Sequence, residues 1–294
     1  MSEDAASEAY HQDSRRFRDA LARTASETGF SERLIEKDYY CSVLLKDLGV
    51  LFGQGLVFKG GTCLSKVHAD FFRLSEDLDF GMSVKPEASR GDRRRAAEPI
   101  KGHVAGIVAR LPFFTEEVAL TGQNNNKQYN GKLAYRSVVT GEYESIKIEV
   151  SLREEVLLSS QELPAKTMLI DPFTGAAALT PIVVRALSLR EAYAEKARAA
   201  LTRRDPAIRD FFDLDNAVRK GLIQHSASDF LGLVARKLAL TDDPVDTSAE
   251  RCENLARQIE TQLKPVLRQA DYQEFALGRV VALLLEIVGA CGRT

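Results

Sequence analysis

Two aspartates separated by one residue, Asp77 and Asp79, are the side chains in this sequence best suited to chemistry. They stand in an alternating run, and the two-residue period of a strand puts both carboxylates on one face. Carboxylates that share a face are costly to bury without a cation, and Mg²⁺ takes oxygen ligands. The pair therefore predicts a site for Mg²⁺ or Mn²⁺, of the kind used in two-metal phosphoryl transfer. Glu149 would be a third metal ligand if its strand lay beside the aspartates and faced the same way.

A glycine-rich turn precedes the aspartates. In Lys59-Gly60-Gly61-Thr62 a short apolar run stops and a helical pattern starts. Glycines let the backbone come close to a ligand, and a helix N-terminus offers free N–H groups to phosphate. Taken singly, a Gly-Gly turn, an Asp-x-Asp strand or one glutamate is commonly structural or solvent-exposed. The order strand, Gly-Gly-Thr, helix, Asp-x-Asp strand and carboxylate strand is instead typical of a nucleotidyltransferase palm.

A second charged group lies in the C-terminal part of the chain. Lys196 follows apolar positions of helical spacing, where a lysine could neutralise a triphosphate as a point charge. Asp210 and Asp213 are one turn apart and share a helix face, and Arg209 directly precedes them. The alternative interpretation is a charged helix tip with local ion pairs.

The elements that would position these residues can be read from the periodicity of apolar side chains. Helices are predicted within 14–50, with a break at Gly29, and over 62–72 and 92–110. Strands are predicted at 56–59, 77–82, 113–120, 132–140 and 142–152, with a turn at 123–127. From about residue 177 the chain is predicted to be helical. These elements predict an α+β protein, with a nucleotidyltransferase-type mixed sheet in residues 1–170 and a helical domain, residues 171–294, that completes the active site.

Composition excludes several classes of protein. The 294 residues are 45% hydrophobic and 28% charged, which is ordinary for a globular protein. The four cysteines lack C-x-x-C or zinc spacing, and the four histidines are scattered. No apolar run approaches the length of a membrane span, and residues 1–18 lack the apolar core of a signal peptide. We therefore expect a cytoplasmic protein with no membrane partner.

Charge is distributed unevenly along the chain. The net charge is −2, yet residues 85–136 carry ten Lys/Arg and five Asp/Glu, so this stretch is +5 and the remainder −7. Four arginines stand within six positions: Arg90, Arg93, Arg94 and Arg95. A basic segment of this kind can meet nucleic-acid phosphates through counterion release. It could equally be a solvated charged loop or helix end.

Several motifs in a fixed order resemble the AbiEii family of toxin nucleotidyltransferases, which includes the MenT-type toxins. The resemblance runs from about Leu34 to Lys220. It is carried by Ile35-Glu36-Lys37-Asp38-Tyr39, Val57 to Lys66, Arg73 to Phe80, Lys196, and the Arg209-Asp210-x-x-Asp213 run.

The resemblance implies roles for these residues. Gly60, Gly61 and Thr62 would hold the nucleotide phosphates, and Asp77 and Asp79 would bind the metals. Lys196 would contact the triphosphate, with Asp213 as a second essential acid that orients Lys196 or the acceptor. Three further motif positions are predicted to bind the nucleotide: Lys59, Ser65 and Lys66.

Ser75 matches a position that an antitoxin kinase phosphorylates in some relatives. A phosphate there would place about two negative charges beside the metal site and repel an incoming triphosphate. The third carboxylate varies in the family, so the role of Glu149 is inferred from its strand position alone.

By this resemblance we expect a toxin that transfers a nucleotide from an NTP to an RNA acceptor, with tRNA 3′ ends as the expected target and a cognate antitoxin as partner. The added nucleotide would block aminoacylation. Two alternatives remain open at this point. The acceptor could be a small molecule or a protein, or the chain could bind NTP as a regulator without transferring it.

Overall fold

The chain forms two compact units, Met1–Leu187 and Ser188–Thr294. The computed structural model describes residues 9–85, 87–153 and 155–292. The sequence-based division at 170/171 falls earlier than this one. Residues 171–187 include the strand Ile182–Ala186, which pairs within the sheet of the first unit. The first unit therefore extends to Leu187.

The first unit is built on one seven-stranded sheet with the order β3-β4-β5-β2-β1-β7-β6. β2 pairs in parallel with β5 and β1 with β7, while the other neighbours are antiparallel. This mixed sheet confirms the predicted α+β class. The strands are β1 (Leu56–Lys59), β2 (Leu78–Met82), β3 (Phe114–Gln123), β4 (Gln128–Arg136), β5 (Tyr143–Ser151), β6 (Gln161–Ala165) and β7 (Ile182–Ala186).

The prediction of helix from residue 177 onward was wrong at β7, and β6 was not predicted. β7 has only five residues and ends at Ala186, shortly before α7 begins at Leu189, so the helical pattern was extended over it. β6 contains Pro164, which cannot donate a hydrogen bond to a ladder and is therefore tolerated at a sheet edge. β6 is the last strand in the sheet order, so it meets this requirement.

The two faces of the sheet differ in chemistry. Phe58, Phe80, Val150 and Tyr129 stand in register across β1, β2, β5 and β4, and all are buried. The neighbouring positions in each strand point to the opposite face, where the predicted site residues lie.

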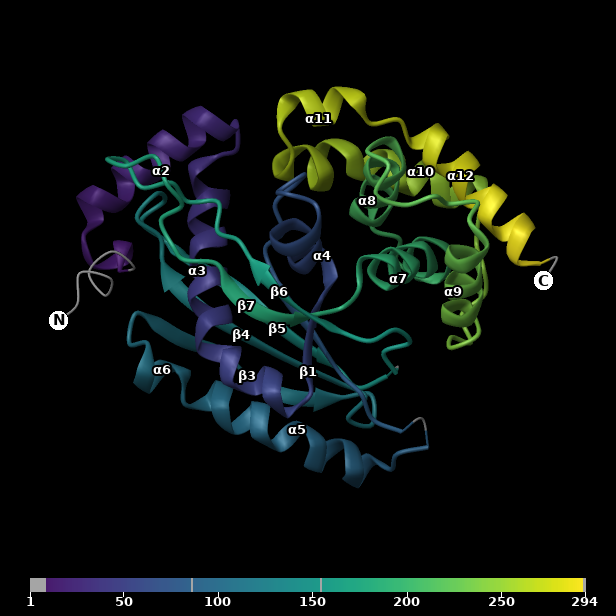
Figure 1. Ribbon diagram of the computed structural model, residues 1–294, viewed down its shortest axis with the longest axis horizontal. Coiled ribbons are helices and arrows are strands. Elements are labelled where there is room, and N and C mark those ends of the chain that lie inside the picture. Colours follow the sequence, from purple (N-terminus) through teal and green to yellow (C-terminus); the bar gives the residue numbers. More distant parts are fainter. Residues whose placement is uncertain (1–8, 86, 154, 293–294) are drawn as a thin grey trace. The chain divides into compact units, whose positions relative to one another are not determined.

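Two helices cover the apolar face: α3 (Glu32–Leu48) and α5 (Arg90–Ala105) (Figure 1). Tyr40 of α3 stacks on Tyr135 of β4, with ring centroids 3.9 Å apart. His103 Nε2 of α5 lies 2.8 Å from Asp47 Oδ2 of α3, which links the two helices. The remaining helical segments of this unit are η1 (Tyr10–Gln12), α2 (Ser14–Thr28), η2 (Gly49–Gln54), α4 (Gly60–Cys63), η3 (Leu64–His68) and α6 (Ile107–Arg110).

Helix boundaries follow the expected local signals in most places. Gly29 ends α2 in the left-handed conformation, with φ 76°, as the predicted break requires. The helix predicted to reach residue 72 ends at His68, because Asp70 and Phe71 take φ values of 45° and 54°. Left-handed residues cannot continue a right-handed helix.

The regular elements described in the second unit are helical. They are α7 (Leu189–Thr202), α8 (Ile208–Arg219), α9 (Ser228–Leu238), α10 (Ala249–Gln258), η4 (Ile259–Leu263), η5 (Lys264–Val266), α11 (Gln269–Glu274) and α12 (Leu277–Cys291). α7 packs on α8 and α9, and α12 packs on the same two helices. Among the described residues, no helix combines the length and apolarity needed to cross a membrane.

Candidate active site

Four polar side chains stand in register across the centre of the sheet, on the face opposite the apolar row. We call Lys59, Asp79, Glu149 and Asn130 the polar row. Lys59 of β1 pairs with Asp79 of β2, Asp79 pairs with Glu149 of the parallel strand β5, and Glu149 pairs with Asn130 of β4. The sheet thus places Glu149 directly beside Asp79 and on the same face, as its predicted role requires.

Asp79 packs directly against the glycine turn. Gly60 opens α4 with φ +75°, a conformation that L side chains rarely adopt. A Cβ atom on Gly60 would lie 2.2 Å from Asp79 Oδ2 and 2.8 Å from Asp79 Cβ. Glycine is therefore required here for two reasons, the backbone conformation and the space taken by the carboxylate. The turn and the Asp-x-Asp segment, separated in sequence, form one site.

The second glycine lies against the segment that precedes the aspartates. A Cβ atom on Gly61 would lie 2.6 Å from Arg73 Nη2 and 2.9 Å from Ser75 Oγ. Arg73 is 2% exposed, so its guanidinium is a buried cation beside Ser75. Ser75, predicted as a modification site, thus lies at the glycine turn and within the candidate site.

Thr62 fixes the position of Asp77. Its hydroxyl donates a hydrogen bond to the backbone carbonyl of Asp77, and Thr62 is buried. Asp77 directly precedes β2, although the sequence predicted it inside the strand. This contact gives Thr62 a positioning role, since its hydroxyl is used within the protein rather than directed at solvent.

Lys147 belongs to this site and was missed by the sequence interpretation. Its Nζ lies 2.6 Å from Glu149 Oε2, two residues further along the same face of β5. Burial lowers the pKa of Lys147, but the hydrogen bond to Glu149 and the charges of Glu149, Asp79 and Asp77 outweigh it, so the net pKa is raised. Lys147 is thus a cation on the face of β5 that carries Glu149, the strand neighbour of Asp79. The alternation of Lys147 with buried Ile146 and Ile148 was the available signal.

Ser65 and Lys66, predicted as nucleotide-binding residues, lie inside the protein. Lys66 Nζ contacts Asp38 Oδ1 at 2.7 Å and Ser42 Oγ at 2.7 Å, and its side chain has no exposed surface. Ser65 Oγ donates to the carbonyl of Arg73 at 2.6 Å. These contacts use the polar atoms that a phosphate would need. The two residues support the fold around the glycine turn, and we leave them out of the proposed nucleotide site.

The predicted residues of the second unit form a cluster of their own. Lys196 Nζ of α7 lies 2.7 Å from Asp210 Oδ1 and 2.9 Å from Asp213 Oδ2 of α8. Asp213 is fully buried, whereas the Lys196 side chain keeps 14% of its surface exposed. Arg209 is directed elsewhere, since its Nε donates to the carbonyl of Gln262 at 3.3 Å. Both acids are thus placed to orient Lys196.

The donor set at the polar row suits a magnesium ion. Mg²⁺ is commonly held by one or two carboxylates together with substrate phosphates, rather than by a full protein cage. Asp79, and Asp77 directly before β2, would offer such oxygen ligands. Within the described residues, no three His, Cys, Asp or Glu side chains are grouped closely enough to hold a metal by themselves.

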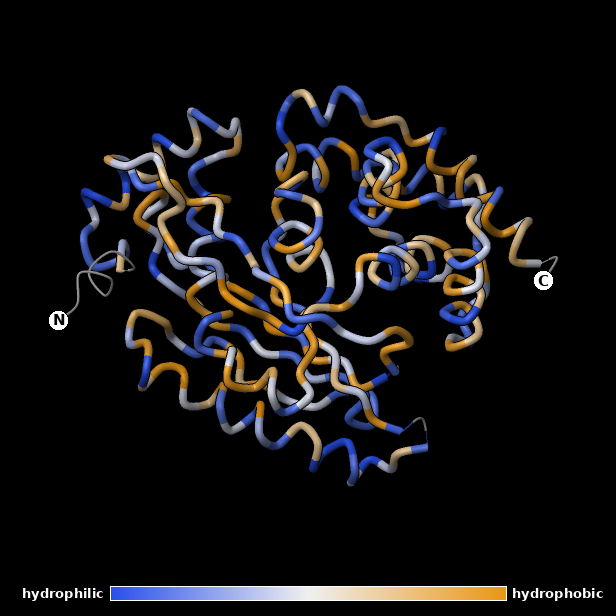
Figure 2. Tube along the Cα trace, in the orientation of Figure 1, coloured by the Kyte–Doolittle hydropathy of each residue, from blue (hydrophilic) through white to orange (hydrophobic). Residues whose placement is uncertain are grey.

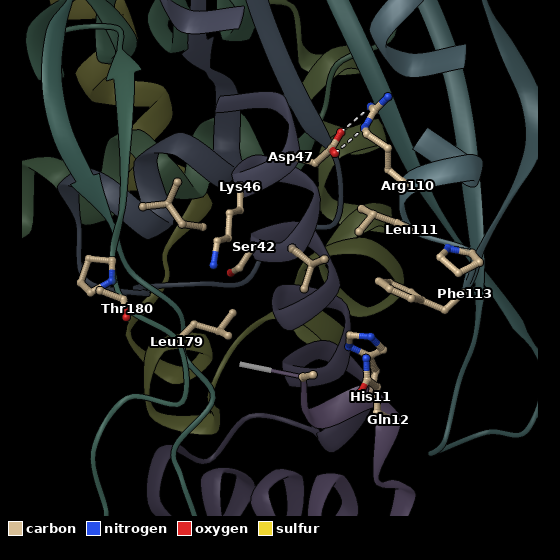
Figure 3. A pocket seen from close by; sticks show the side chains of 15 residues that line it. His11, Gln12, Ser42, Lys46, Asp47, Arg110, Leu111, Phe113, Leu179 and Thr180 are labelled. Carbon is tan, nitrogen blue, oxygen red and sulfur yellow. Dashed lines mark hydrogen bonds and ion pairs between the residues drawn. The ribbon is translucent and has the colours of Figure 1, made fainter. Parts of the chain in front are cut away.

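A pocket of about 1230 Å³ lies elsewhere in the first unit, beside α3 (Figure 3). Leu111, Phe113 and Leu179 contribute apolar walls, and none of the predicted site residues lines it. Asp47, at its rim, is held by two hydrogen bonds from Arg110, both 2.8 Å long. The charge of Asp47 is thereby compensated within the protein.

Comparison with known protein families indicates nucleotidyl transfer, the chemistry that the sequence motifs predicted. The family model described as "Nucleotidyl transferase AbiEii toxin, Type IV TA system" matches residues 44–284. No protein of curated function matches the chain significantly in sequence.

Two solved structures from Helicobacter pylori align with most of the chain. The crystal structure of JHP933 aligns with a TM-score of 0.51 at 14% identity, and the match covers 90% of this chain and 94% of that one. A provisionally assigned nucleotidyltransferase aligns with a TM-score of 0.43 at 16% identity, over 89% of this chain and 91% of that one. With the family model spanning most of the sequence and the glycine turn placed against Asp79, the chain belongs to the AbiEii nucleotidyltransferase toxins of type IV toxin–antitoxin systems.

Proposed function

We propose that this protein transfers a nucleotide from an NTP to the 3′ end of an RNA, with tRNA as the acceptor, in a reaction that needs Mg²⁺ or Mn²⁺. The observation that carries the proposal is the packing of Asp79 against Gly60, with Glu149 in register beside it. That arrangement would place a divalent cation held by Asp79 beside the glycine turn, where the phosphates would bind. The family itself implies a nucleotide substrate and an antitoxin partner.

In this reaction the terminal 3′-hydroxyl of the acceptor attacks the α-phosphorus of the NTP. A bond forms between that oxygen and phosphorus, the bond to the bridging oxygen breaks, and pyrophosphate leaves while the hydroxyl proton passes to solvent. Asp77 and Asp79 would hold the divalent ion, which when bound supplies positive charge to the phosphates.

The chain's own residues have distinct tasks in this proposal. Gly60 leaves room for Asp79 to lie against the start of α4, beside which the phosphates would bind, and Gly61 leaves room for Arg73 and Ser75. Lys59 and Lys147 flank the carboxylates with positive charge on the same face of the sheet. Lys196 would contact the triphosphate while Asp210 and Asp213 orient its ammonium group. A phosphate on Ser75 would place negative charge at the glycine turn and oppose triphosphate binding.

The test is a transfer assay with a matched control. Purified protein is incubated with Mg²⁺, total tRNA and each α-labelled NTP in turn. We expect the wild type and Asp19→Ala, an exposed aspartate on α2, to label tRNA equally. Asp77→Ala should label none and should relieve growth inhibition in cells, with an unchanged melting temperature. A folded Asp77→Ala protein that still transfers label would exclude this mechanism.

Label that appears on a protein or small molecule of a cell lysate, and not on tRNA, would instead favour those acceptors. NTP binding without pyrophosphate release on any acceptor would favour the alternative that the protein binds NTP as a regulator and does not transfer it.

A further inference from the structure

A small basic pocket lies at the edge of the sheet, between the start of α5 and the β3–β4 hairpin. It has a volume of about 350 Å³. We call it the Tyr129 pocket, and its lining is Arg90, Gly91, Arg94, Lys101, Thr121, Gly122, Asn126 and Tyr129. Figure 2 shows the first turns of α5 as strongly hydrophilic. Three of the lining side chains are cationic and none is acidic, so the pocket suits an anion.

One buried polar atom in this pocket lacks a partner. Tyr129 is 2% exposed, and among the described residues its hydroxyl has no hydrogen-bond partner. A buried, unsatisfied polar group is costly and needs an explanation, such as a ligand that completes it. Burial raises the pKa of Tyr129, with Glu98 adding to the shift and Arg94 and Arg90 opposing it. The phenol is therefore protonated at neutral pH and can donate a hydrogen bond.

The backbone around the hydroxyl is shaped to leave this space open. A Cβ atom on Gly122 would lie 2.3 Å from Asn126 Oδ1 and 3.0 Å from the Tyr129 ring. Asn124, Asn125 and Asn126 all have positive φ, between 49° and 60°. Asn126 Nδ2 then donates to the carbonyl of Arg90 at 3.2 Å, which fastens the hairpin to the start of α5. The pocket is a built feature of two elements rather than a chance gap.

The cations of the pocket have little internal compensation. Within the described part of the chain, no ion pair joins Arg90 or Arg94 to a carboxylate. Lys101 Nζ approaches Glu98 Oε2 at 3.5 Å, but the Glu98 side chain is 62% exposed, and such pairs contribute little. By contrast, the neighbouring Arg95 pairs with Asp92 of its own helix. An incoming anion would thus meet two arginines that are not already neutralised.

The register of the sheet relates this pocket to the polar row. Thr121, which lines the pocket, pairs with Asn130, the last member of the row. Asp79 and Thr121 are three strand spacings apart, or about 14 Å. Gln123 and Gln128, two residues away along β3 and β4, hydrogen-bond to Asn130 at 3.0 and 3.3 Å. Tyr129 belongs to the apolar row, so its hydroxyl lies on the side of the sheet that α5 covers. An RNA strand with its 3′ end at Asp79 would therefore cross the polar row and pass around the edge strand β3 to reach the pocket, too far away for the triphosphate of the same site.

We propose that the Tyr129 pocket binds a backbone phosphate of the RNA acceptor, through Arg90, Arg94 and the Tyr129 hydroxyl. This inference rests on the proposed function, because an RNA acceptor is what would bring a chain of phosphates from Asp79 to this edge. The pocket would hold the acceptor in place and take no part in bond making.

The test measures equilibrium binding of labelled total tRNA, without NTP, over a series of KCl concentrations. Arg90→Gln and Arg94→Gln should each weaken binding about tenfold, as expected for a lost charge-assisted contact. Each should also reduce the slope of log K against log [salt] by about 0.7 to 0.9. Arg95→Gln is the matched control on the same helix and should change binding less than twofold.

Tyr129→Phe separates a binding role from a structural one. It removes only an unsatisfied hydroxyl, so the melting temperature should stay the same or rise while tRNA binding weakens about threefold or more. Unchanged binding in Tyr129→Phe and Arg94→Gln would overturn the proposal, as would a wild type that binds no tRNA.

A parallel transfer assay on the same preparations distinguishes the two proposals. Wild type that labels tRNA, together with variants that bind tRNA normally, means that the pocket inference alone has failed. Wild type that neither binds nor labels tRNA means that the proposed acceptor has failed as well.

Discussion

At the scale of single residues, the candidate site depends on Gly60, which has no side chain. Gly60 leaves room for the Asp79 carboxylate to lie against the start of α4, where a β-carbon would overlap it. The carboxylate is also flanked within the sheet, by Lys59 on one side and Glu149 on the other. The backbone conformation of the turn and the strand register therefore both position Asp79.

Gly60→Ala should abolish transfer while the protein remains folded. The new methyl group would displace Asp79, and displacements of about 1 Å at a reacting centre can cost about 100-fold in rate. The positive φ adds a stability cost of about 1–2 kcal/mol. The measurements are transfer rate and urea unfolding.

Gly81→Ala is the matched control for that change. Gly81 lies on the same strand as Asp79, and its added Cβ would meet Lys59 Cδ at an ordinary 3.6 Å. We expect nearly normal transfer from this variant. If Gly60→Ala retained full activity, the close packing of Asp79 on the turn would be irrelevant to function.

At the scale of elements, a buried ion pair fastens the helix after the glycine turn to α3. Lys66 of η3 reaches Asp38 and Ser42 of α3, and Asp38 Oδ2 also accepts from the backbone N–H of Met168 at 3.0 Å. These contacts join three segments that are distant in sequence. They hold α4 and η3, and with them the glycine turn, against the rest of the first unit.

Lys66→Met should destabilise the protein by about 3–5 kcal/mol, because the Asp38 carboxylate would remain buried without its cation. The double variant Asp38→Asn, Lys66→Met should recover much of that loss. Urea unfolding at constant pH measures both. The KM for NTP, measured well below the melting temperature, should be unchanged in the double variant. A KM raised tenfold would instead restore Lys66 as a nucleotide ligand.

The sheet strands around the site could be predicted from alternation or from a bounding glycine turn. The alternation in Ser145 to Leu152 predicted β5, and the placement of Glu149 followed from it. β7 was merged with the helical pattern of α7, which begins three residues after it ends, and β6 holds a proline that its edge position tolerates. Lys66 was predicted to bind phosphate from its place in the motif. A motif gives the residue type but does not show that the side chain is buried and paired with Asp38. Lys147 was missed because its role appears only once β5 lies beside β2.

At the scale of the whole molecule, the division into two units is decided by strand pairing. β7 lies between β1 and β6 in the sheet order, so the first unit is complete only when residues 182–186 are included. A boundary at residue 170 would leave one side of β1 unpaired and β6 without its neighbour.

Two fragments test this boundary. A fragment of residues 1–187 should be monomeric and unfold cooperatively with urea, because its sheet is whole. A fragment of residues 1–170 should aggregate, since exposed strand edges are templates for intermolecular pairing. Size-exclusion chromatography and circular dichroism distinguish the two. Equal solubility and cooperativity in both fragments would contradict the role assigned to β7.

The late position of β7 also sets an order of events during synthesis. Phe58 of β1 pairs with Ala186, so β1 gains its second neighbour only after about two-thirds of the chain has been made. At bacterial and eukaryotic elongation rates the intervening residues take roughly 6 to 25 seconds to emerge. Throughout that interval the strand that carries Lys59 and leads into the glycine turn is an open edge on the nascent chain. The order of translation thus leaves β1 paired on one side only until the ribosome has passed β7.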